Sequence, residues 1–87
     1  MIATLSAAAN SMQGTLQGED RAFTGISTDT RTIGDGELFF ALHGPNFDGR
    51  DYVGIALQNG AAGAVVTRRT RDAIAQIEVD DTRAALG

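Results

Sequence analysis

The sequence predicts an α/β fold in which a small mixed, partly parallel sheet is flanked by short helices. Two observations carry this prediction. The run ELFFAL at 37–42 is of strand length and almost continuously apolar, which is typical of a strand covered on both faces. A polar loop, an amphipathic helical segment at 52–59 and a second apolar run at 64–67 follow it. Strand, helix and strand in this order predict a right-handed parallel unit.

The size of the chain limits it to a single domain, residues 1–87, with one core. A domain of this size buries only roughly 60–65% of the surface of its unfolded chain. Little room is left for a deep active site enclosed by this chain alone.

The charge balance argues against nucleic acid or an anionic membrane as partner. Seven arginines and no lysine stand against eleven acidic residues, which gives a net charge of -4. An acidic surface repels polyanions at long range. Without lysine the chain can form neither a P-loop nor a Schiff base. Without cysteine it can form no disulfide, no cysteine zinc site and no catalytic thiol.

The N-terminal stretch MIATLSAAANSMQG lacks the basic start and the long apolar core of a signal peptide. The sequence also has no run of about 18 apolar residues that could cross a membrane. We therefore expect a cytoplasmic protein, and we expect no metal site in this chain.

A short helix is predicted near the N-terminus, with Thr4 as its cap and Gly14 just past its end. Its apolar positions recur with helical spacing at Leu5, Ala8, Ala9 and Met12. Residues 15–17 then predict a short strand, and Gly18 begins a polar turn.

Residues 22–30 are predicted to form a strand that runs into a polar end. That end offers hydroxyl groups, a carboxylate and a guanidinium, contributed by Ser27, Thr28, Asp29, Thr30 and Arg31. Two interpretations remain open. The groups bind a ligand, or Asp29 and the hydroxyls only tie down a turn.

The run 37–42 is predicted to be the central strand. The loop 43–49 after it is expected to be irregular, because Pro45 has no N–H group and the glycines favour turns. Open α/β sheets usually bind ligands in loops beyond the carboxyl ends of their strands. The loop 43–49 is therefore a second candidate site.

Asp51 is predicted to cap a helix over 52–59 that ends at Gly60. The helix should bury a broad apolar face made by Tyr52, Val53, Ile55, Ala56 and Leu57. Asp48 and Asp51 could also form the carboxylate pair of a small hydrolase, although carboxylates at the start of a helix more often cap it. The next strand is predicted at 64–67.

The basic cluster of the sequence comprises Arg68, Arg69 and Arg71. It could grip a phosphate, or it could be a solvated turn before a short helical piece at 72–75.

The C-terminal segment predicts a short strand at 77–79 and then a helix at 83–86. The caps of this helix are expected from Asp80, Asp81 and Thr82. A helix begun so close to the last residue predicts that the sequence is a fragment of a longer protein.

Five segments, in this order, resemble the N-terminal domain of the Mur ligases. They are TDTR at 28–31, GELFFALHG at 36–44, FDGRDY at 47–52, NGAAGAVV at 59–66 and VDDTRAALG at 79–87. Within that family the similarity is greatest to the ligases that add D-alanyl-D-alanine to UDP-N-acetylmuramoyl-tripeptide. The diaminopimelate- or lysine-adding ligases are the near relatives.

This resemblance implies a three-domain cytoplasmic enzyme of peptidoglycan synthesis. In that family the N-terminal domain holds the uridine diphosphate end of the substrate, and a central P-loop domain binds ATP and Mg. A C-terminal domain helps to bind the incoming amino acid or dipeptide. This chain would then be the substrate-holding domain alone, without catalytic residues or a cofactor. Its partners would be UDP-N-acetylmuramoyl-tripeptide and the remaining ligase domains in cis.

The resemblance also assigns site residues. The TDTR segment matches the place where the family presents a serine or threonine to the nucleotide, so Thr30 is the best match and Thr28 its neighbour. The second nucleotide-contacting stretch is matched by Pro45, Asn46 and Phe47. The residues assigned to holding the loops together are Asp29, Arg31 and Asp48. His43 departs from the family pattern, since many relatives have lysine there.

A different class of function stays open at this point. The Thr/Asp/Arg loop could belong to a non-catalytic interaction module that binds a protein partner. A reading frame with a P-loop GKT segment soon after Gly87 would favour the ligase, and a stop codon there would favour the module.

Overall fold

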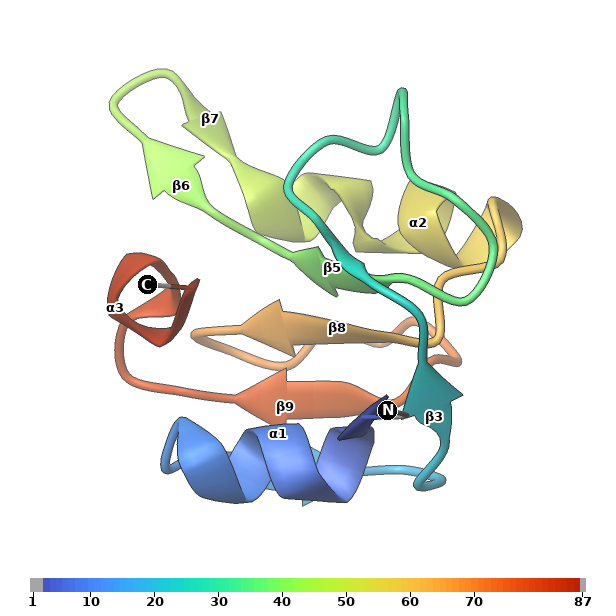
Figure 1. Ribbon diagram of the computed structural model, residues 1–87. Coiled ribbons are helices and arrows are strands. Elements are labelled where there is room, and N and C mark those ends of the chain that lie inside the picture. The colour runs from blue at the N-terminus through green and yellow to red at the C-terminus, as the bar shows by residue number, and fades with distance from the viewer. Residues whose placement is uncertain (1–2, 87) are drawn as a thin grey trace.

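A five-stranded sheet forms the middle layer of the structure, a computed structural model that describes residues 3–86. The helix α1 (Leu5–Ser11) covers one face of the sheet, and α2 (Val53–Gln58) covers the other (Figure 1). The strands of this sheet are β2 (Thr15–Gln17), β4 (Ile26–Ser27), β5 (Leu38–Phe40), β8 (Gly63–Val66) and β9 (Gln76–Glu78). The predicted α/β fold with a mixed, partly parallel sheet and short helices is confirmed.

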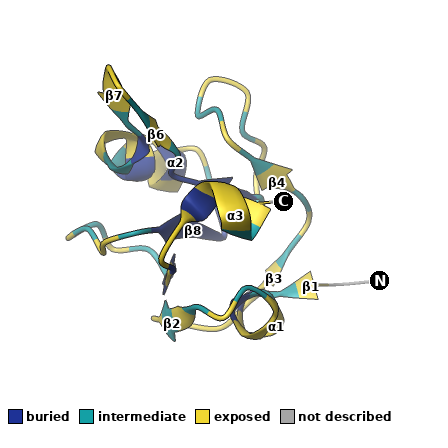
Figure 2. Cartoon of the chain, turned by 90° about the vertical axis from the view of Figure 1, so that its left-hand side faces the viewer, coloured by how far each residue is buried: buried dark blue, intermediate teal, exposed yellow. Residues whose placement is uncertain are grey.

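The two faces of the sheet carry two separate apolar clusters. Alternate residues of β5 point to opposite faces, so that Leu38 and Phe40 pack with α1 and Phe39 packs with α2. Their exposed fractions are 1%, 3% and 2% respectively. Figure 2 shows the same burial along β8. Burying a side chain of this size stabilises the fold by about 1.5–3 kcal/mol. The burial of β5 on both faces confirms the predicted strand covered on both sides.

The strand order is β2-β9-β8-β5-β4, with β2 antiparallel to β9 and the other four strands parallel. The predicted β5–α2–β8 parallel unit is confirmed. The middle strand is β8, however, and the prediction that 37–42 is central was wrong by one place. Two continuous apolar strands cannot be ranked by their pattern, because both are covered on both faces.

Residues 22–30 do not form one strand. β3 (Ala22–Phe23) pairs with β1 (Ala3–Thr4) in a separate two-stranded sheet, whereas β4 joins the main sheet. The chain turns between them, where the Thr24 N–H donates to the Gly36 carbonyl oxygen at 2.9 Å. A pattern of alternating residues does not reveal that the chain changes sheets.

The loop 43–49 is more regular than expected. β6 (His43–Gly44) and β7 (Phe47–Asp48) form an antiparallel hairpin, and Pro45 lies in its turn, where no N–H donor is needed. The Gly49 N–H closes the base of the hairpin by donating to the Leu42 carbonyl oxygen at 2.6 Å. The prediction of an irregular loop was therefore wrong.

The helix after this hairpin begins differently from the prediction. A 3-10 helix, η1 (Gly49–Tyr52), precedes α2, and its cap is Asp48 rather than Asp51. Of the expected apolar face, only Val53 and Ala56 are buried. The side chains that remain exposed are Tyr52, Ile55 and Leu57.

Two helix caps agree with the sequence. The Thr4 side chain accepts from the Ala7 N–H at the start of α1. The Asp81 carboxylate accepts from the N–H groups of Arg83 and Ala84 at the start of α3 (Thr82–Leu86). Residues 71–74 form bends and residue 75 belongs to no regular element, so the predicted helical piece at 72–75 was wrong. Within residues 3–86, no helix has the length and the apolar character needed to span a membrane.

Candidate functional site

A hollow of about 490 Å³ lies at the carboxyl ends of β4 and β5, and we call it the carboxyl-edge hollow. It is lined by Thr28, Asp29, Thr30, Arg31, Phe39, Leu42, Phe47, Gly49 and Tyr52. Because β4 and β5 are parallel neighbours, the segments that follow them leave the sheet at the same edge. Figure 2 looks onto this edge, with the hairpin β6–β7 on one side and the loop after β4 on the other.

The loop after β4 is held in shape by its own side chains. The Asp29 carboxylate accepts from the Arg31 backbone N–H at 2.8 Å and from the Arg31 guanidinium at 2.8–3.2 Å. The Ser27 hydroxyl accepts from the Asp29 N–H at 3.1 Å and lies 3.0 Å from the Asp29 carbonyl oxygen. The loop is therefore a compact turn that closes on itself.

The Arg31 side chain donating to Asp29, with a further contribution from the Arg31 backbone N–H, lowers the pKa of Asp29 to about 2. The same pairing raises the pKa of Arg31. Both groups are therefore charged at neutral pH, and each largely neutralises the other. Asp29 is thus suited to shaping the loop and unsuited to acting as a general base.

Asn59 is a residue of this site that sequence reasoning missed. Its side-chain Nδ2 donates to the Thr30 carbonyl oxygen at 3.1 Å. The other side-chain hydrogen bonds of this loop stay within residues 27–32. Among the described residues, the Asn59 bond is therefore the only one involving a side chain that ties the loop to another part of the chain. The sequence signal, Asn before Gly at a helix end, indicated only where α2 stops.

The opposite wall of the hollow is aromatic. Phe47 and Tyr52 line it and are 51% and 43% exposed. Phe47 lies opposite Gly44 in the hairpin register, and its ring occupies the space that a side chain at Gly44 would need. A Cβ at Gly44 would come within 2.8 Å of the Phe47 ring. The hairpin thus presents an exposed ring to the hollow.

Five of the eight predicted site residues line the same hollow, and three do not. Those that line it are Thr28, Asp29, Thr30, Arg31 and Phe47. Pro45 and Asn46 are exposed at the tip of the hairpin. Asp48 accepts from the Arg50 N–H at 3.0 Å and lies 3.6 Å from the Arg50 guanidinium. Asp48 therefore caps η1, which is the structural role expected of a carboxylate at the start of a helix.

The His43 ring does not line the hollow, but its carbonyl oxygen accepts from the Arg83 guanidinium at 3.3 Å. This contact joins α3 to the hairpin. In the part of the chain that the structure describes, no three side chains of His, Cys, Asp or Glu come together as a metal site would require.

The arrangement is suited to binding rather than to chemistry. Two threonine hydroxyls and the backbone of a fixed loop face an apolar, aromatic wall. The charged groups among the lining residues are Asp29 and Arg31, which are already paired. A polar ligand with a flat ring fits these groups, through hydrogen bonds on one side and ring contacts on the other.

Comparisons with known proteins agree with this architecture. UDP-N-acetylmuramoyl-tripeptide--D-alanyl-D-alanine ligase of Escherichia coli is 39% identical over 97% of this chain. A 2,6-diaminopimelate-adding ligase of Rickettsia prowazekii is 40% identical over 71% of it. The crystal structure of MurF from Acinetobacter baumannii superposes on 99% of this chain with a TM-score of 0.88 and 34% identity.

The chain spans only part of these relatives, since it covers 19% of the length of the Escherichia coli ligase, 13% of the Rickettsia ligase and 20% of the Acinetobacter chain. The family model described as "Mur ligase family, catalytic domain" matches residues 22–87. The chain therefore belongs to the Mur ligase family, and its fold is similar to that of a portion of MurF.

Proposed function

We propose that this domain holds the uridine diphosphate moiety of UDP-N-acetylmuramoyl-tripeptide for a ligase that adds D-alanyl-D-alanine. The observation that carries the proposal is the convergence of the loop 28–31 and the aromatic pair Phe47 and Tyr52 on one hollow. The similarity to the Escherichia coli ligase extends over both of these segments.

The chemistry of the hollow fits such a ligand. A diphosphate needs hydroxyl and backbone N–H donors, which Thr28, Thr30 and their loop supply. A uracil ring needs an apolar surface, which Phe47 and Tyr52 supply. The hollow of about 490 Å³ also lies within the usual range of about 300–1,000 Å³ for small-molecule sites.

We assign no catalytic step to this chain, although the matched family model bears the description of a catalytic domain. ATP and Mg would bind elsewhere in the parent ligase, because the chain has no lysine for a P-loop. The further partners we propose are the remaining ligase domains in cis. A cytoplasmic location stays a prediction.

The diaminopimelate-adding ligases are the second candidate, supported by the 40% identity to the Rickettsia enzyme. A non-catalytic protein-interaction module remains a third interpretation of the loop 28–31. Two assays of the full-length protein separate the two ligases. One uses UDP-N-acetylmuramoyl-tripeptide with D-alanyl-D-alanine, and the other uses the corresponding UDP-N-acetylmuramoyl-dipeptide with diaminopimelate or lysine. Activity with neither pair would favour the module.

The direct test is titration of the ¹⁵N-labelled chain with uridine diphosphate, followed by NMR. We expect saturable shifts in residues 28–31 and 47–52, and an affinity reduced roughly fivefold in Thr30→Val, because one hydrogen bond contributes about 1 kcal/mol. Thr15→Val makes the same change on the exposed edge strand β2 and should leave the affinity unchanged. The absence of shifts in both segments at saturating nucleotide would refute the proposal.

In the full-length enzyme, Thr30→Val should mainly raise KM for the UDP substrate, because it removes binding that ground state and transition state share. A large fall in kcat at constant KM would contradict a purely binding role for Thr30.

A further inference from the structure

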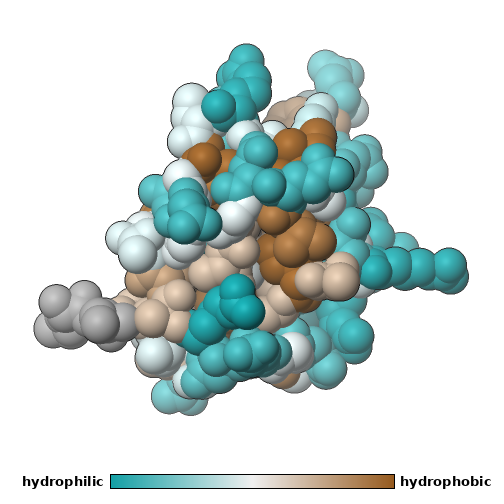
Figure 3. Space-filling model, turned by 90° about the vertical axis from the view of Figure 1, so that its right-hand side faces the viewer, coloured by the Kyte–Doolittle hydropathy of each residue, from teal (hydrophilic) through white to brown (hydrophobic). Residues whose placement is uncertain are grey.

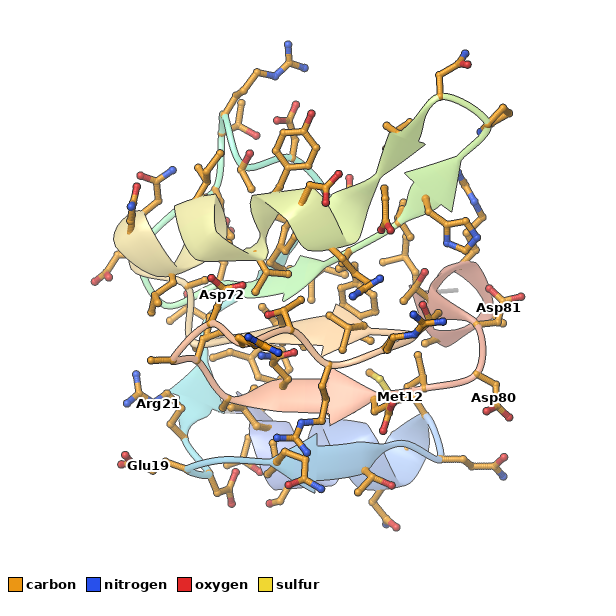
Figure 4. The ribbon with its side chains drawn as sticks, turned by 180° about the vertical axis from the view of Figure 1, so that it is seen from behind. Met12, Glu19, Arg21, Asp72, Asp80 and Asp81 are labelled. Atoms are coloured by element: carbon orange, nitrogen blue, oxygen red, sulfur yellow. The ribbon has the colours of Figure 1, made fainter. Side chains whose placement is uncertain are left out.

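A second hollow, of about 730 Å³, lies at the amino ends of β8 and β9, and we call it the amino-edge hollow. Its lining comes from the segment before β8, the connection before β9, and the turn after β2. Figure 4 shows Asp72 below α2, with Glu19 after β2 and Arg21 before β3 at the same end of the sheet. Because β4, β5, β8 and β9 are parallel, this edge is opposite to the carboxyl-edge hollow.

The connection between β8 and β9 is built around the buried side chain of Gln76, which is 3% exposed. The Gln76 Oε1 accepts from the Thr70 N–H at 2.9 Å, and Nε2 donates to the Thr70 carbonyl and hydroxyl oxygens, both at 3.2 Å. The Thr70 hydroxyl in turn donates to the Asp72 carboxylate at 2.7 Å. A fully bonded buried amide fixes the backbone of this connection.

Arg69 and Arg71 flank Thr70 on this fixed backbone, and both are exposed and line the hollow. Within residues 3–86, neither guanidinium has a carboxylate within 4.0 Å. The third arginine of the hollow, Arg21, lies 3.7 Å from Glu19 in an exposed pair. Such an exposed pair contributes little stability, so Arg21 can exchange Glu19 for an anion that binds it more strongly.

The charge of this hollow differs in sign from that of the whole chain. Three guanidinium groups line it against the two carboxylates of Glu19 and Asp72, whereas the chain has a net charge of -4. Guanidinium groups bind phosphate oxygens through paired N–H donors. Arg69 and Arg71 have no carboxylate partner among the described residues and stand on a rigid connection, so together they form the basis of an anion site.

The remaining lining indicates the size and character of the ligand. Figure 3 looks onto the amino edge, where apolar surface near the centre is bordered by hydrophilic side chains. Leu57 and Ile74 contribute apolar side chains to the hollow. A volume of about 730 Å³ accommodates a small molecule, while the acidic remainder of the surface repels an extended polyanion.

We propose that the amino-edge hollow binds a small molecule that carries a phosphate or diphosphate group, held by Arg69 and Arg71. Arg21 releases Glu19 to become the third cationic partner of the ligand. The site is separate from the carboxyl-edge hollow and does not depend on the function proposed for it.

The test is titration of the ¹⁵N-labelled chain with inorganic pyrophosphate, observed at the backbone amides and the arginine Nε–H signals. We expect saturable shifts at residues 69–72 and at the side chains of Arg69 and Arg71. The double variant Arg69→Gln/Arg71→Gln should weaken binding at least tenfold. The matched control is Arg68→Gln, an exposed neighbour that does not line the hollow, and its affinity should change less than twofold.

The site would be ruled out by any of three results with pyrophosphate: shifts that fail to saturate, a loss of affinity in Arg68→Gln as large as in the double variant, or shifts at residues 28–31 instead of 69–72. Citrate serves as the carboxylate arm of the experiment, and equal affinity for citrate and pyrophosphate would overturn the assignment to phosphate. Thr30→Val, which alters the other hollow, should leave pyrophosphate binding unchanged.

Discussion

The two hollows lie at opposite edges of one sheet and differ in how their charges are arranged. At the carboxyl edge, Arg31 is paired with Asp29 through several hydrogen bonds, and exposed aromatic rings form the facing wall. At the amino edge, Arg69 and Arg71 have no such partners within the described chain. The first edge therefore offers hydroxyl and backbone groups for hydrogen bonds together with aromatic rings, whereas the second offers guanidinium groups that have no carboxylate partner within residues 3–86.

The hollows also differ in what holds their walls. At the carboxyl edge, the loop after β4 and the hairpin β6–β7 are held by hydrogen bonds at scattered points. These run from Asn59 to Thr30, from Gly49 to Leu42 and from Arg83 to His43. The amino-edge connection rests on one buried amide with four hydrogen bonds, that of Gln76. Variants of these residues should affect one edge and spare the other.

Gly49→Ala should have the largest effect, and it should act on the carboxyl edge. A methyl group at this position would overlap the Leu42 carbonyl oxygen and the Ala41 backbone, which cannot move as a flexible side chain would. We expect a loss of about 2–4 kcal/mol in the free energy of unfolding, measured by urea denaturation.

Gly34→Ala is the matched control for this change. A methyl group there meets Glu37 side-chain atoms at 3.5 Å, an ordinary contact. Its effect should stay within about 0.5 kcal/mol. Equal effects of the two variants would show that the close approach at Gly49 is unimportant.

Gln76→Leu should have the next largest effect, and it should act on the amino edge. It leaves the N–H and carbonyl groups of Thr70 without the partners they now have. The expected cost is about 1–3 kcal/mol in the free energy of unfolding, with faster hydrogen exchange at the Thr70 amide. The shifts that uridine diphosphate produces at residues 28–31 and 47–52 should not change, and their loss in this variant would mean that the two edges are coupled.

Asn59→Ala should weaken ligand binding at the carboxyl-edge hollow, although the Asn59 side chain does not line that hollow. Removing the hydrogen bond to Thr30 frees the loop 28–32, and we expect uridine diphosphate to bind roughly threefold to tenfold more weakly. Gln58→Ala, the exposed neighbour, is the control and should retain full affinity. If the amide signals of residues 28–31 already shift in the ligand-free Asn59→Ala variant, the loop itself has moved. Such shifts would distinguish a displaced loop from a failure of the proposed function.

The smallest effect concerns pH. Because the pKa of Asp29 is lowered from 3.8 to about 2 by Arg31, the pair contributes stability that is fully present above about pH 4. This contribution is lost as the pH falls from about 4 through about 2. Asp29→Asn should remove this part of the acid dependence of unfolding, and NMR titration of the carboxyl group measures the pKa directly. A pKa near 3.8 would mean that the pair does not form in solution.

Local pattern predicted much of the fold because the relevant physics is local. The apolar run at 37–42, the caps Thr4 and Asp81, and the strand β2 lie where the sequence placed them. The errors have a common origin as well. The split of 22–30 between two sheets and the central place of β8 both depend on partners distant in the chain.

The candidate site follows the same division. The sequence identified the polar loop 28–31 and the ring of Phe47, and the motif resemblance linked them. It did not reveal that Tyr52 completes the aromatic wall or that Pro45 and Asn46 lie away from the hollow at the hairpin tip.

By itself, the sequence determined the fold class, the family and the chemical character of the two loops, since residue types and their spacing encode these. Only the tertiary structure decided that Asn59 reaches the Thr30 carbonyl across 29 residues, and that Arg69, Arg71 and Arg21 line one hollow. The physical reason is the sheet itself. Parallel strands bring segments distant in sequence to a common edge, and their pairing is fixed by burial on both faces of the sheet.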